Sequence, residues 1–406
     1  MLVKSILGNC LVAIFISAAL AIPAQQAEEE ANMAPLIVPT SEKKSLIQDS
    51  YIVVLHPDKV DKVEIKDQAI KSGIKHIYEL QDFKGYAGKF DAEVLKKIRK
   101  DPRVKYVEHD FEFSGGEILT QNNAPWGLAR VSHRPKLNDT TNSKYIYDSR
   151  CGEGVTAYVI DSGIYTSHPE FEGRARWGAT FAPDGDKDLN GHGTHVAGTI
   201  GSKTYGVAKK VKLVAVKVLN ARNTGSNSNI IAGVNWAAKD QKNNKKYSSV
   251  ANMSIQGGKS PALNDAVNNA VREGLAMIVC SGNYNNNACN YSPASAVNGT
   301  CVAATDINDK KASFSNYGPC VHIHGPGVDI LSTWNNGGTR KSSGCSMATP
   351  HVTGVAACFL TQKPIDPLAL RSLLKEVATR LPNPDFPPNT TNLMVFNNVT
   401  AAALAV

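Results

Sequence analysis

The chain lacks three features that would point to nucleic-acid binding, membrane insertion or a repeat architecture. Its net charge of +8 over 406 residues comes from dispersed lysines and arginines, and no basic helix is interleaved with aromatic residues. After residue 21, no apolar stretch is long enough to span a membrane. No internal repeat is visible. We therefore expect neither nucleic acid nor a membrane as a partner, and we interpret the positive charge as a solvated surface.

The first 21 residues have the pattern of a secretory signal peptide. Lys4 precedes an apolar run, residues 6–21, that ends in small residues. A membrane-spanning helix is the alternative, but the run is short for one and its end is typical of signal cleavage. We predict cleavage after Ala21 and a secreted, extracellular protein.

Secretion changes how the cysteines are interpreted, because disulfides persist outside the cell. Of the eight cysteines, Cys10 leaves with the signal, so seven remain and at least one thiol is free or paired with another molecule. Asn252 heads a sequon in a strand with a buried pattern and is expected to stay unmodified. The sequons predicted to carry N-glycans, which agree with the secretory route, begin at Asn138, Asn298, Asn389 and Asn398.

Residues 22–118 are expected to form a propeptide. Residues 22–49 are rich in Glu, Ala and Pro with little periodicity, which indicates a linker. The module at 50–112 follows the order β-α-β-β-α-β, which is typical of a small α+β sandwich. Its expected strands are 51–55, 74–80, 86–90 and 104–108, and its expected helices are 63–70 and 91–99. A Gly pair then follows, and we place the mature N-terminus between Gly115 and Gln121.

Residues 119–406 are expected to form the catalytic domain. Short apolar strands alternate with helical patterns, which favours the α/β class with a doubly wound, mostly parallel sheet covered on both faces. The expected strands are 155–160, 211–218, 250–254, 277–280 and 300–304, and the expected helices include 230–239, 261–273 and 347–360. With 42% hydrophobic residues the chain can bury at least one large core.

Three short motifs supply an acid, a base and a hydroxyl nucleophile. They are Val159-Ile-Asp161-Ser-Gly163, Asn190-Gly-His192-Gly-Thr-His-Val-Ala-Gly198 and Ser343-Gly-Cys-Ser346-Met-Ala-Thr-Pro350. Asp161 directly follows a predicted strand, at the sheet edge where α/β enzymes place their sites. The order Asp, His, Ser differs from the Ser, acid, His of nucleophile-elbow hydrolases and from the His, Asp, Ser of double-barrel proteases.

Each motif alone has a more ordinary explanation. Asp-Ser-Gly is a common turn, and a serine at a helix start is most often an N-cap. His192 and His195 could form a metal pair, but a third ligand and the acid of a His-Glu-x-x-His motif are missing, so no metal is predicted. The conjunction of the motifs favours catalysis. The Ser346 N–H at a helix start faces a developing oxyanion, and Asn283, after another strand, could donate the second hydrogen bond.

These motifs resemble those of the subtilisin-like serine proteases, most closely the fungal proteinase K branch. The similarity runs from residue 123 to about residue 398, and the module at 50–112 similarly resembles the family's inhibitory prodomain. It implies an autoprocessed zymogen whose own propeptide acts as an intramolecular inhibitor. Further similar stretches are Asn123-Ala-Pro-Trp-Gly-Leu-Ala-Arg130, Asn290-Tyr-Ser-Pro-Ala-Ser295, Ser313-Phe-Ser-Asn-Tyr-Gly318 and Asp329-Ile-Leu-Ser-Thr-Trp334.

The resemblance implies a role for each site residue. Ser346 attacks the scissile carbonyl, His192 takes its proton and passes it to the leaving amine, and Asp161 orients the imidazole. The Asn283 amide and the Ser346 N–H form the oxyanion hole. Protein and peptide substrates are expected to bind as an added strand through main-chain hydrogen bonds, which favours broad specificity. The implied substrate-binding residues are Gly225, Ser226, Asn227, Ser254, Ile255, Gln256, Gly257 and Tyr291.

Two residues beside the site depart from the family's pattern. Cys345 stands where relatives carry Thr, and we favour a small buried apolar role for it over a redox role. Gln256 replaces a glycine in the strand that lines the primary specificity pocket, so a narrower pocket or an altered register is expected. One alternative is therefore a non-enzymatic, protease-like binding protein, although all four catalytic residues are present. A nucleophile-elbow esterase is a second alternative, but Gly-x-Ser-x-Gly is absent.

No cofactor is expected for the chemistry, and nothing in the sequence indicates an oligomer, so we expect a monomer. His322 and Arg134 stand where the proteinase K pattern has calcium-binding Asp and Thr, which argues against structural calcium at those positions.

Cys289 and Cys320 match a pair bridged in thermophilic bacterial relatives, which implies that disulfide. The sequence does not pair the remaining cysteines Cys151, Cys280, Cys301 and Cys358, and the candidate free thiols are Cys345 and Cys358.

Overall fold

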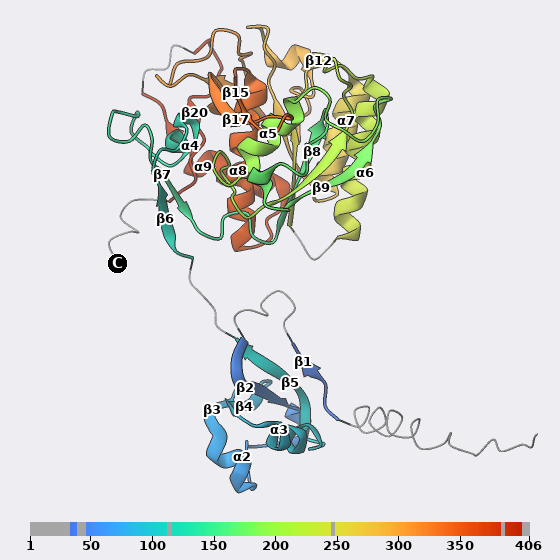
Figure 1. The fold of residues 1–406 in the computed structure, drawn as a ribbon, viewed down its shortest axis with the longest axis vertical. Helices are drawn as coiled ribbons and strands as arrows, with labels where there is room; N and C mark the ends of the chain where they lie inside the picture. The colour runs from blue at the N-terminus through green and yellow to red at the C-terminus, as the bar shows by residue number, and fades with distance from the viewer. Residues whose placement is uncertain (1–32, 39–45, 112–115, 245–247, 383–385, 400–406) are drawn as a thin grey trace, which may run out of the picture. The chain divides into compact units, whose positions relative to one another are not determined.

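The computed structural model of the chain describes residues 33–38, 46–111, 116–244, 248–382 and 386–399. The chain divides into two units, residues 1–115 and residues 116–406 (Figure 1). The predicted signal peptide, residues 1–21, and Gly115 of the predicted processing region lie outside the described residues. In the described ranges, no helix has both the length and the apolar character needed to cross a membrane.

The first unit is a five-stranded sheet, in the order β1-β5-β2-β4-β3, with the helices α2 and α3. Neighbouring strands are antiparallel except β1 and β5, which are parallel. Val53, Ile98 and Val107 are fully buried at the centre of its core. The elements are β1 (Leu36–Ile37), β2 (Leu46–Leu55), a 3-10 turn (Pro57–Lys59), α2 (Gln68–Gly73), β3 (Ile74–Glu79), β4 (Lys84–Lys89), α3 (Ala92–Arg99) and β5 (Val104–Phe111).

The helix expected at 63–70 is wrong in its position. The structure begins α2 after Asp67, whose Oδ1 accepts hydrogen bonds from the N–H groups of Ala69 (2.8 Å) and Ile70 (3.3 Å). Val63 instead precedes the helix, and its N–H donates to Glu79 Oε1 at 3.0 Å. The apolar spacing over 63–70 therefore reflects core contacts of an extended segment, and the N-cap decides where the helix starts.

The second unit is built on a nine-stranded sheet, in the order β19-β20-β16-β15-β13-β11-β8-β10-β9. The pairs from β20 to β9 are parallel, and β19 pairs with β20 in the antiparallel direction. This is the doubly wound arrangement that the sequence predicts. The strands of this sheet are β8 (Val155–Asp161), β9 (Ala175–Thr180), β10 (Lys212–Lys217), β11 (Ser248–Met253), β13 (Ala276–Cys280), β15 (Thr300–Thr305), β16 (Ile323–Pro326), β19 (Thr379–Arg380) and β20 (Leu393–Met394).

Helices cover both faces of this sheet (Figure 1), because the central strands direct apolar side chains to each face. Ala157 and Val159 of β8 pack in the core with α5 and α8. Tyr158 and Ile160 of the same strand pack in the opposite core with α6 and α7. The helices of the unit are α4 (Trp126–Val131), α5 (His192–Gly201), α6 (Asn227–Asn243), α7 (Pro261–Arg272), α8 (Cys345–Gln362) and α9 (Pro367–Val377), with 3-10 turns at Pro169–Phe171 and Ala288–Asn290.

The carboxyl edge of the sheet is where the predicted motifs lie. β8 ends at Asp161, and β11 and β13 end just before the segments 254–257 and 281–284. The chain runs from β8 to β9 and β10 on one side and then to β11 on the other, which makes a topological switch point at β8. In the described part of the second unit, three antiparallel strand pairs lie outside the main sheet: β6 (Ile118–Gln121) with β7 (Tyr145–Asp148), β12 (Gly257–Gly258) with β14 (Tyr291–Ser292), and β17 (Ile330–Thr333) with β18 (Thr339–Ser342).

Two disulfides connect distant parts of the second unit. Cys289 is joined to Cys320, the pair that the resemblance implies, and Cys151 is joined to Cys358. The expectation that Cys358 is free is therefore wrong, because α8 brings it beside a residue 207 positions away in the chain. Among the described residues the free thiols are the buried Cys280, Cys301 and Cys345.

Candidate active site

The carboxylate of Asp161 and the imidazole of His192 form a hydrogen bond at the carboxyl edge of the sheet. The Asp161 side chain is fully buried, whereas the side chain of His192, the first residue of α5, is 15% exposed. His192 Nδ1 lies 2.7 Å from Asp161 Oδ1, which also accepts from the Ser162 N–H at 2.7 Å. Because a carboxylate only accepts, Nδ1 carries the proton and Nε2 remains as the acceptor. This places a base on a partly exposed side chain.

Burial and charge act in opposite directions on the two histidines of α5. Burial lowers the pKa of His192, but the charge and hydrogen bond of Asp161 outweigh it, so the pKa is raised above its ordinary value. Burial lowers the pKa of His195 to about 4, so this residue is neutral at physiological pH. His195 Nε2 contacts two backbone carbonyls, one in β17 and one in β18, each at 3.0 Å. Its ring is therefore turned to that hairpin and does not pair with His192.

Asp188, which the sequence analysis did not single out, fixes the start of α5. Its Oδ1 accepts from the N–H groups of Asn190 (3.1 Å) and Gly191 (2.8 Å), and its Oδ2 accepts from the Thr194 N–H at 3.0 Å. Ser162 Oγ donates to Asp188 Oδ1 at 2.9 Å, which connects this cap to the segment that follows Asp161. An acidic residue shortly before a helix can indicate a cap. The polar residues around Asp188, however, gave this segment the sequence pattern of an exposed loop.

Ser346 lies in the first turn of α8, which packs against α5. Its Oγ donates to the Ser254 carbonyl at 3.1 Å, and Ser254 Oγ donates to the Ser346 carbonyl at 2.9 Å. His192 is the first residue of α5, so the packing of α5 against α8 brings the helices of the two residues together. Within the described residues no hydrogen bond joins Ser346 Oγ to His192.

The side chain of Asn283 is oriented by the backbone of α8. Its Oδ1 accepts from the Cys345 N–H at 2.8 Å, which leaves the Nδ2 group free to donate. A methyl group placed on Gly344 would lie 3.4 Å from Asn283 Nδ2 and 3.6 Å from the Ser346 nitrogen. The two predicted oxyanion donors thus border the same small space, which a glycine keeps open.

Asn316 is a second residue that the sequence analysis missed, and it holds the loop that carries Asn283. The side chain is fully buried. Its Nδ2 donates to the Ser281 carbonyl at 2.8 Å, and its Oδ1 accepts from the N–H groups of Tyr284 (2.9 Å) and Asn286 (3.0 Å). Its only sequence signal was its place within a stretch similar to the protease family.

The two residues that depart from the family's pattern both contact this loop. Gln256 Oε1 accepts from the Asn283 N–H at 2.6 Å. The fully buried Cys345 uses its sulfur as an acceptor for the Gly282 N–H at 3.1 Å. The thiol is therefore more than an apolar filler, because it satisfies a buried backbone donor.

The predicted substrate-binding residues fall into two connected groups. Gly225, Ser226 and Asn227 are exposed at the start of α6, where Ser226 is the N-cap and Asn227 is the first helical residue. Asn227 Nδ2 donates to Ser260 Oγ at 3.0 Å, which brings this segment beside the one after β11. There Ser254 and Ile255 are buried, Gln256 and Gly257 are half-buried, and Tyr291 belongs to β14, the partner of β12.

At His322 and Arg134, where the family resemblance places calcium ligands, an arginine guanidinium donates hydrogen bonds to the nearby carbonyl oxygens. Arg371 Nη1 donates to the carbonyls of Val297 (2.8 Å) and Gly299 (3.3 Å) and lies 3.5 Å from His322 Nε2. Arg134 Nη1 donates to the last carbonyl of α9 at 3.1 Å. A positive side chain already uses these oxygens, so the residues present do not fit a calcium ion at either position.

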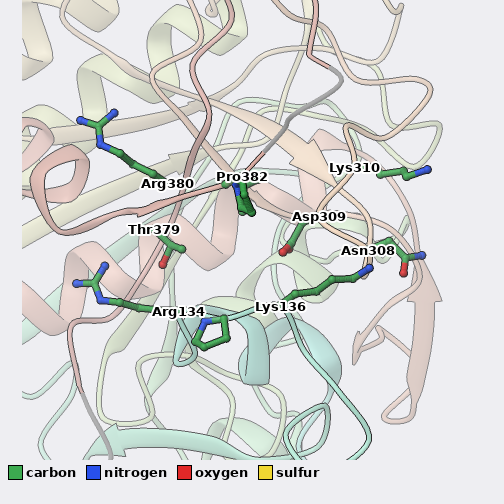
Figure 2. A pocket seen from close by; sticks show the side chains of 10 residues that line it. Arg134, Lys136, Asn308, Asp309, Lys310, Thr379, Arg380 and Pro382 are labelled. Atoms are coloured by element: carbon green, nitrogen blue, oxygen red, sulfur yellow. The ribbon is translucent and has the colours of Figure 1, made fainter.

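A hollow of about 640 Å³ lies apart from the predicted catalytic residues. Figure 2 shows that its side chains come from the segment after α4, from the turn at 308–310 and from the region of β19. Its acid, Asp309, is paired with the fully buried Arg130 at 2.6 Å. None of the predicted catalytic or substrate-binding residues lines it, so its size does not make it the candidate site. The lining residues are Arg134, Pro135, Lys136, Asn308, Asp309, Lys310, Thr379, Arg380, Leu381 and Pro382.

The predicted glycosylation sites differ in exposure. Asn138, Asn389 and Asn398 are exposed, and Asn298 is half-buried with its Nδ2 3.4 Å from the Asn268 carbonyl. Asn252, expected to stay unmodified, is fully buried in β11. Three of the four predicted sites are thus accessible at the surface of the second unit.

Comparison with known protein families identifies the family to which the chain belongs. The model described as the subtilase family matches residues 152–394, and the model described as peptidase inhibitor I9 matches residues 39–114. The chain belongs to the subtilase family. As a subtilase it is a serine protease, and its first described unit is an inhibitor-type prodomain. The predicted family and fold class are confirmed.

Relatives of this subtilase match it over most of its length. It is 42% identical over 416 residues to the subtilisin-like serine protease Cur l 4.0101 of Cochliobolus lunatus, covering 90% of this chain and 82% of that protein. It is 41% identical to the subtilisin-like serine protease pepC of Aspergillus niger, covering 89% and 76%. A crystal structure of a cold adapted subtilisin-like serine proteinase is 44% identical, with a TM-score of 0.64, covering 68% of this chain and 100% of that one.

Proposed function

We propose that this subtilase is a secreted endopeptidase of broad specificity, made as a zymogen, that hydrolyses peptide bonds through an acyl-enzyme on Ser346. The observation that carries the assignment is the 2.7 Å hydrogen bond between the buried Asp161 carboxylate and His192 Nδ1. It leaves Nε2 as an acceptor at the start of α5, the helix that packs against α8, and Ser346 lies in the first turn of α8. A carboxylate, an imidazole and a hydroxyl in this arrangement suit acyl transfer.

In the proposed mechanism, Ser346 Oγ turns from the Ser254 carbonyl toward His192 Nε2 and attacks the scissile carbonyl as its proton moves to the imidazole. Asp161 stabilises the resulting imidazolium, in keeping with the raised pKa of His192. The oxyanion accepts from Asn283 Nδ2 and the Ser346 N–H. His192 then protonates the leaving amine, and a water molecule reverses these steps to release the acid.

Main-chain recognition supports the proposal of broad specificity. Asn227 of the segment 225–227 contacts Ser260 at 3.0 Å, and Ser260 lies shortly after the segment 254–257 in the chain. An extended peptide between them would form hydrogen bonds through its own backbone, which is independent of most side chains. Specificity would then arise at individual side-chain positions.

A secreted zymogen is proposed from three further features. The prodomain match at 39–114 lies within the proposed propeptide, residues 22–118. The proposed signal peptide is residues 1–21, and the exposed Asn138, Asn389 and Asn398 are suitable for glycan attachment in the secretory route. Release of the mature domain, residues 119–406, would require cleavage between Gly115 and Gln121.

Casein hydrolysis by the secreted protein tests the function. The wild type is expected to degrade casein, and Ser346→Ala is expected to lose that activity. Ser313→Ala, which changes an exposed serine, is the matched control and should retain it. Equal activity of Ser346→Ala and the wild type would refute the role of Ser346.

Processing of the same variant tests the zymogen proposal. In a host that lacks other extracellular proteases, Ser346→Ala should accumulate with residues 22–118 still attached, because autoprocessing uses the same nucleophile. Intact mass and N-terminal sequencing report the outcome. Normal maturation of Ser346→Ala in that host would contradict autoprocessing.

A further inference from the structure

Two segments border the place where the scissile carbonyl must sit. Residues 254–257 follow β11, and residues 281–284 follow β13, its parallel neighbour in the sheet. The nucleophile is tied to the first segment, because Ser346 Oγ lies 3.1 Å from the Ser254 carbonyl. The oxyanion donor Asn283 belongs to the second. The residue that carries the attacked carbonyl therefore has its Cα, and its side chain, at the space between these segments.

The side chain of Gln256 crosses that space. It starts on the first segment, and its Oε1 accepts from the Asn283 N–H on the second segment at 2.6 Å. A methyl group placed on Gly282 would lie 3.1 Å from the same Oε1. The amide of Gln256 is therefore in contact with the backbone of the second segment.

The base of the same space is also closed. Cys280 Sγ, at the end of β13, donates to the Ile255 carbonyl of the first segment at 3.2 Å. A methyl group on Gly282 would collide with Asn316 Nδ2, so the side chain of Asn316 fills that position. By contrast, nothing lies within 4 Å of the positions that a methyl group would occupy on Gly257 or Gly258. Gln256 is thus the long side chain that reaches from the first segment to the second.

We infer that Gln256 is a specificity-determining residue that admits only small side chains at the residue whose carbonyl Ser346 attacks. A large aromatic or aliphatic side chain could enter only if Gln256 swung away. That movement would leave the Asn283 N–H without its acceptor, on the residue that holds the oxyanion donor. The inference rests on the proposed function and narrows it at this one position, while recognition elsewhere remains through the backbone.

The test uses tetrapeptide p-nitroanilides that differ only in the residue before the scissile bond, which is Ala, Leu or Phe. An organophosphonate serine reagent first counts the active molecules of the wild type, Gln256→Gly and Gln256→Ser. The wild type should cleave the Ala substrate with at least about tenfold higher kcat/KM than the Phe substrate, the scale on which pockets discriminate by size. Gln256→Gly should raise kcat/KM for Phe by about tenfold or more and change Ala much less.

The outcomes separate the inference from the proposed function. Wild-type preference for Phe over Ala, or a Gln256→Gly effect equal on all three substrates, would overturn the inference while leaving the protease intact. No phosphonate reaction and no hydrolysis of any substrate would instead overturn the proposed function. If Gln256→Gly fails to fold, Gln256→Ser shortens the side chain with less backbone freedom and should shift the same Phe-to-Ala ratio upward. An unchanged ratio in a folded, titratable Gln256→Ser would also refute the inference.

Discussion

Replacement of Asp161 by asparagine is the sharpest probe of the acid–base pair. Asp161 Oδ1 accepts two hydrogen bonds, from His192 Nδ1 and from the Ser162 N–H, both at 2.7 Å. An asparagine that keeps its carbonyl in this position has lost the negative charge. One that turns its NH₂ group toward Nδ1 forces the imidazole proton onto Nε2, where no proton from Ser346 can then be accepted. Both arrangements weaken the base.

The expected loss in kcat is about 10⁴-fold, the scale known for this change in a Ser-His-Asp triad, or about 5.4 kcal/mol of transition-state stabilisation. The pH profile should move as well. His192 must be neutral to act as a base, so kcat/KM falls as the pH drops through its pKa. In the wild type, Asp161 raises that pKa above the ordinary value of about 6.5. Without the charge, burial dominates and the acid limb should move to lower pH.

The assay is p-nitroanilide hydrolysis at about pH 5 to 10, with each variant standardised by circular dichroism and thermal unfolding. Asp186→Asn, which removes an exposed carboxylate of the loop before α5, is the matched control and should leave rate and pH profile unchanged. A loss smaller than about tenfold for Asp161→Asn, or an acid limb that moves to higher pH, would refute the reasoning.

Three further predictions have defined outcomes. Asn283→Ala should lower kcat by about 10²–10³-fold with little change in KM, because it removes an oxyanion donor, and an equal effect on KM would count against that role. Cys345→Ala should lower the free energy of unfolding in urea by about 1–3 kcal/mol more than Cys301→Ala, since only the first leaves a buried N–H, that of Gly282, without its acceptor; equal losses would contradict this. Chelation with EDTA should leave Tm unchanged, because the Arg371 guanidinium, and not calcium, occupies the carbonyl oxygens beside His322. Arg371→Ala should lower Tm, because it removes these hydrogen bonds. A fall in Tm on chelation that added calcium reverses would contradict the absence of calcium beside His322.

Much of the fold could be predicted because the central strands are uniform. The runs that became β8, β11 and β13 are mostly apolar and end at or just before Asp or Ser, which is typical of strands buried on both faces. The helix in the prodomain was misplaced because Val63 packs into the core from an extended segment, and apolar spacing alone does not show that. The partner of Cys358 was missed because it lies 207 positions away, a distance over which only the finished fold brings two cysteines together.

The site could be predicted only as far as its residues belong to sequence motifs. Asp161 follows a predicted strand and Ser346 precedes a predicted helix, so the topology of an α/β sheet brings both to one edge. Asp188 and Asn316 escaped prediction because their importance lies in being buried with every polar group paired, which is a property of the tertiary structure. The contact of Gln256 with the Asn283 loop was likewise invisible, since it joins segments after two different strands.

The central claim is that Ser346 is a nucleophile activated by His192. The most direct measurement is the site and stoichiometry of labelling by an organophosphonate serine reagent, read by intact mass and peptide mass spectrometry. The account predicts one adduct per mature chain, located on Ser346, formed by the wild type and much more slowly by His192→Ala. An unlabelled Ser346 in folded wild-type protein, or labelling at the same rate in His192→Ala, would contradict it.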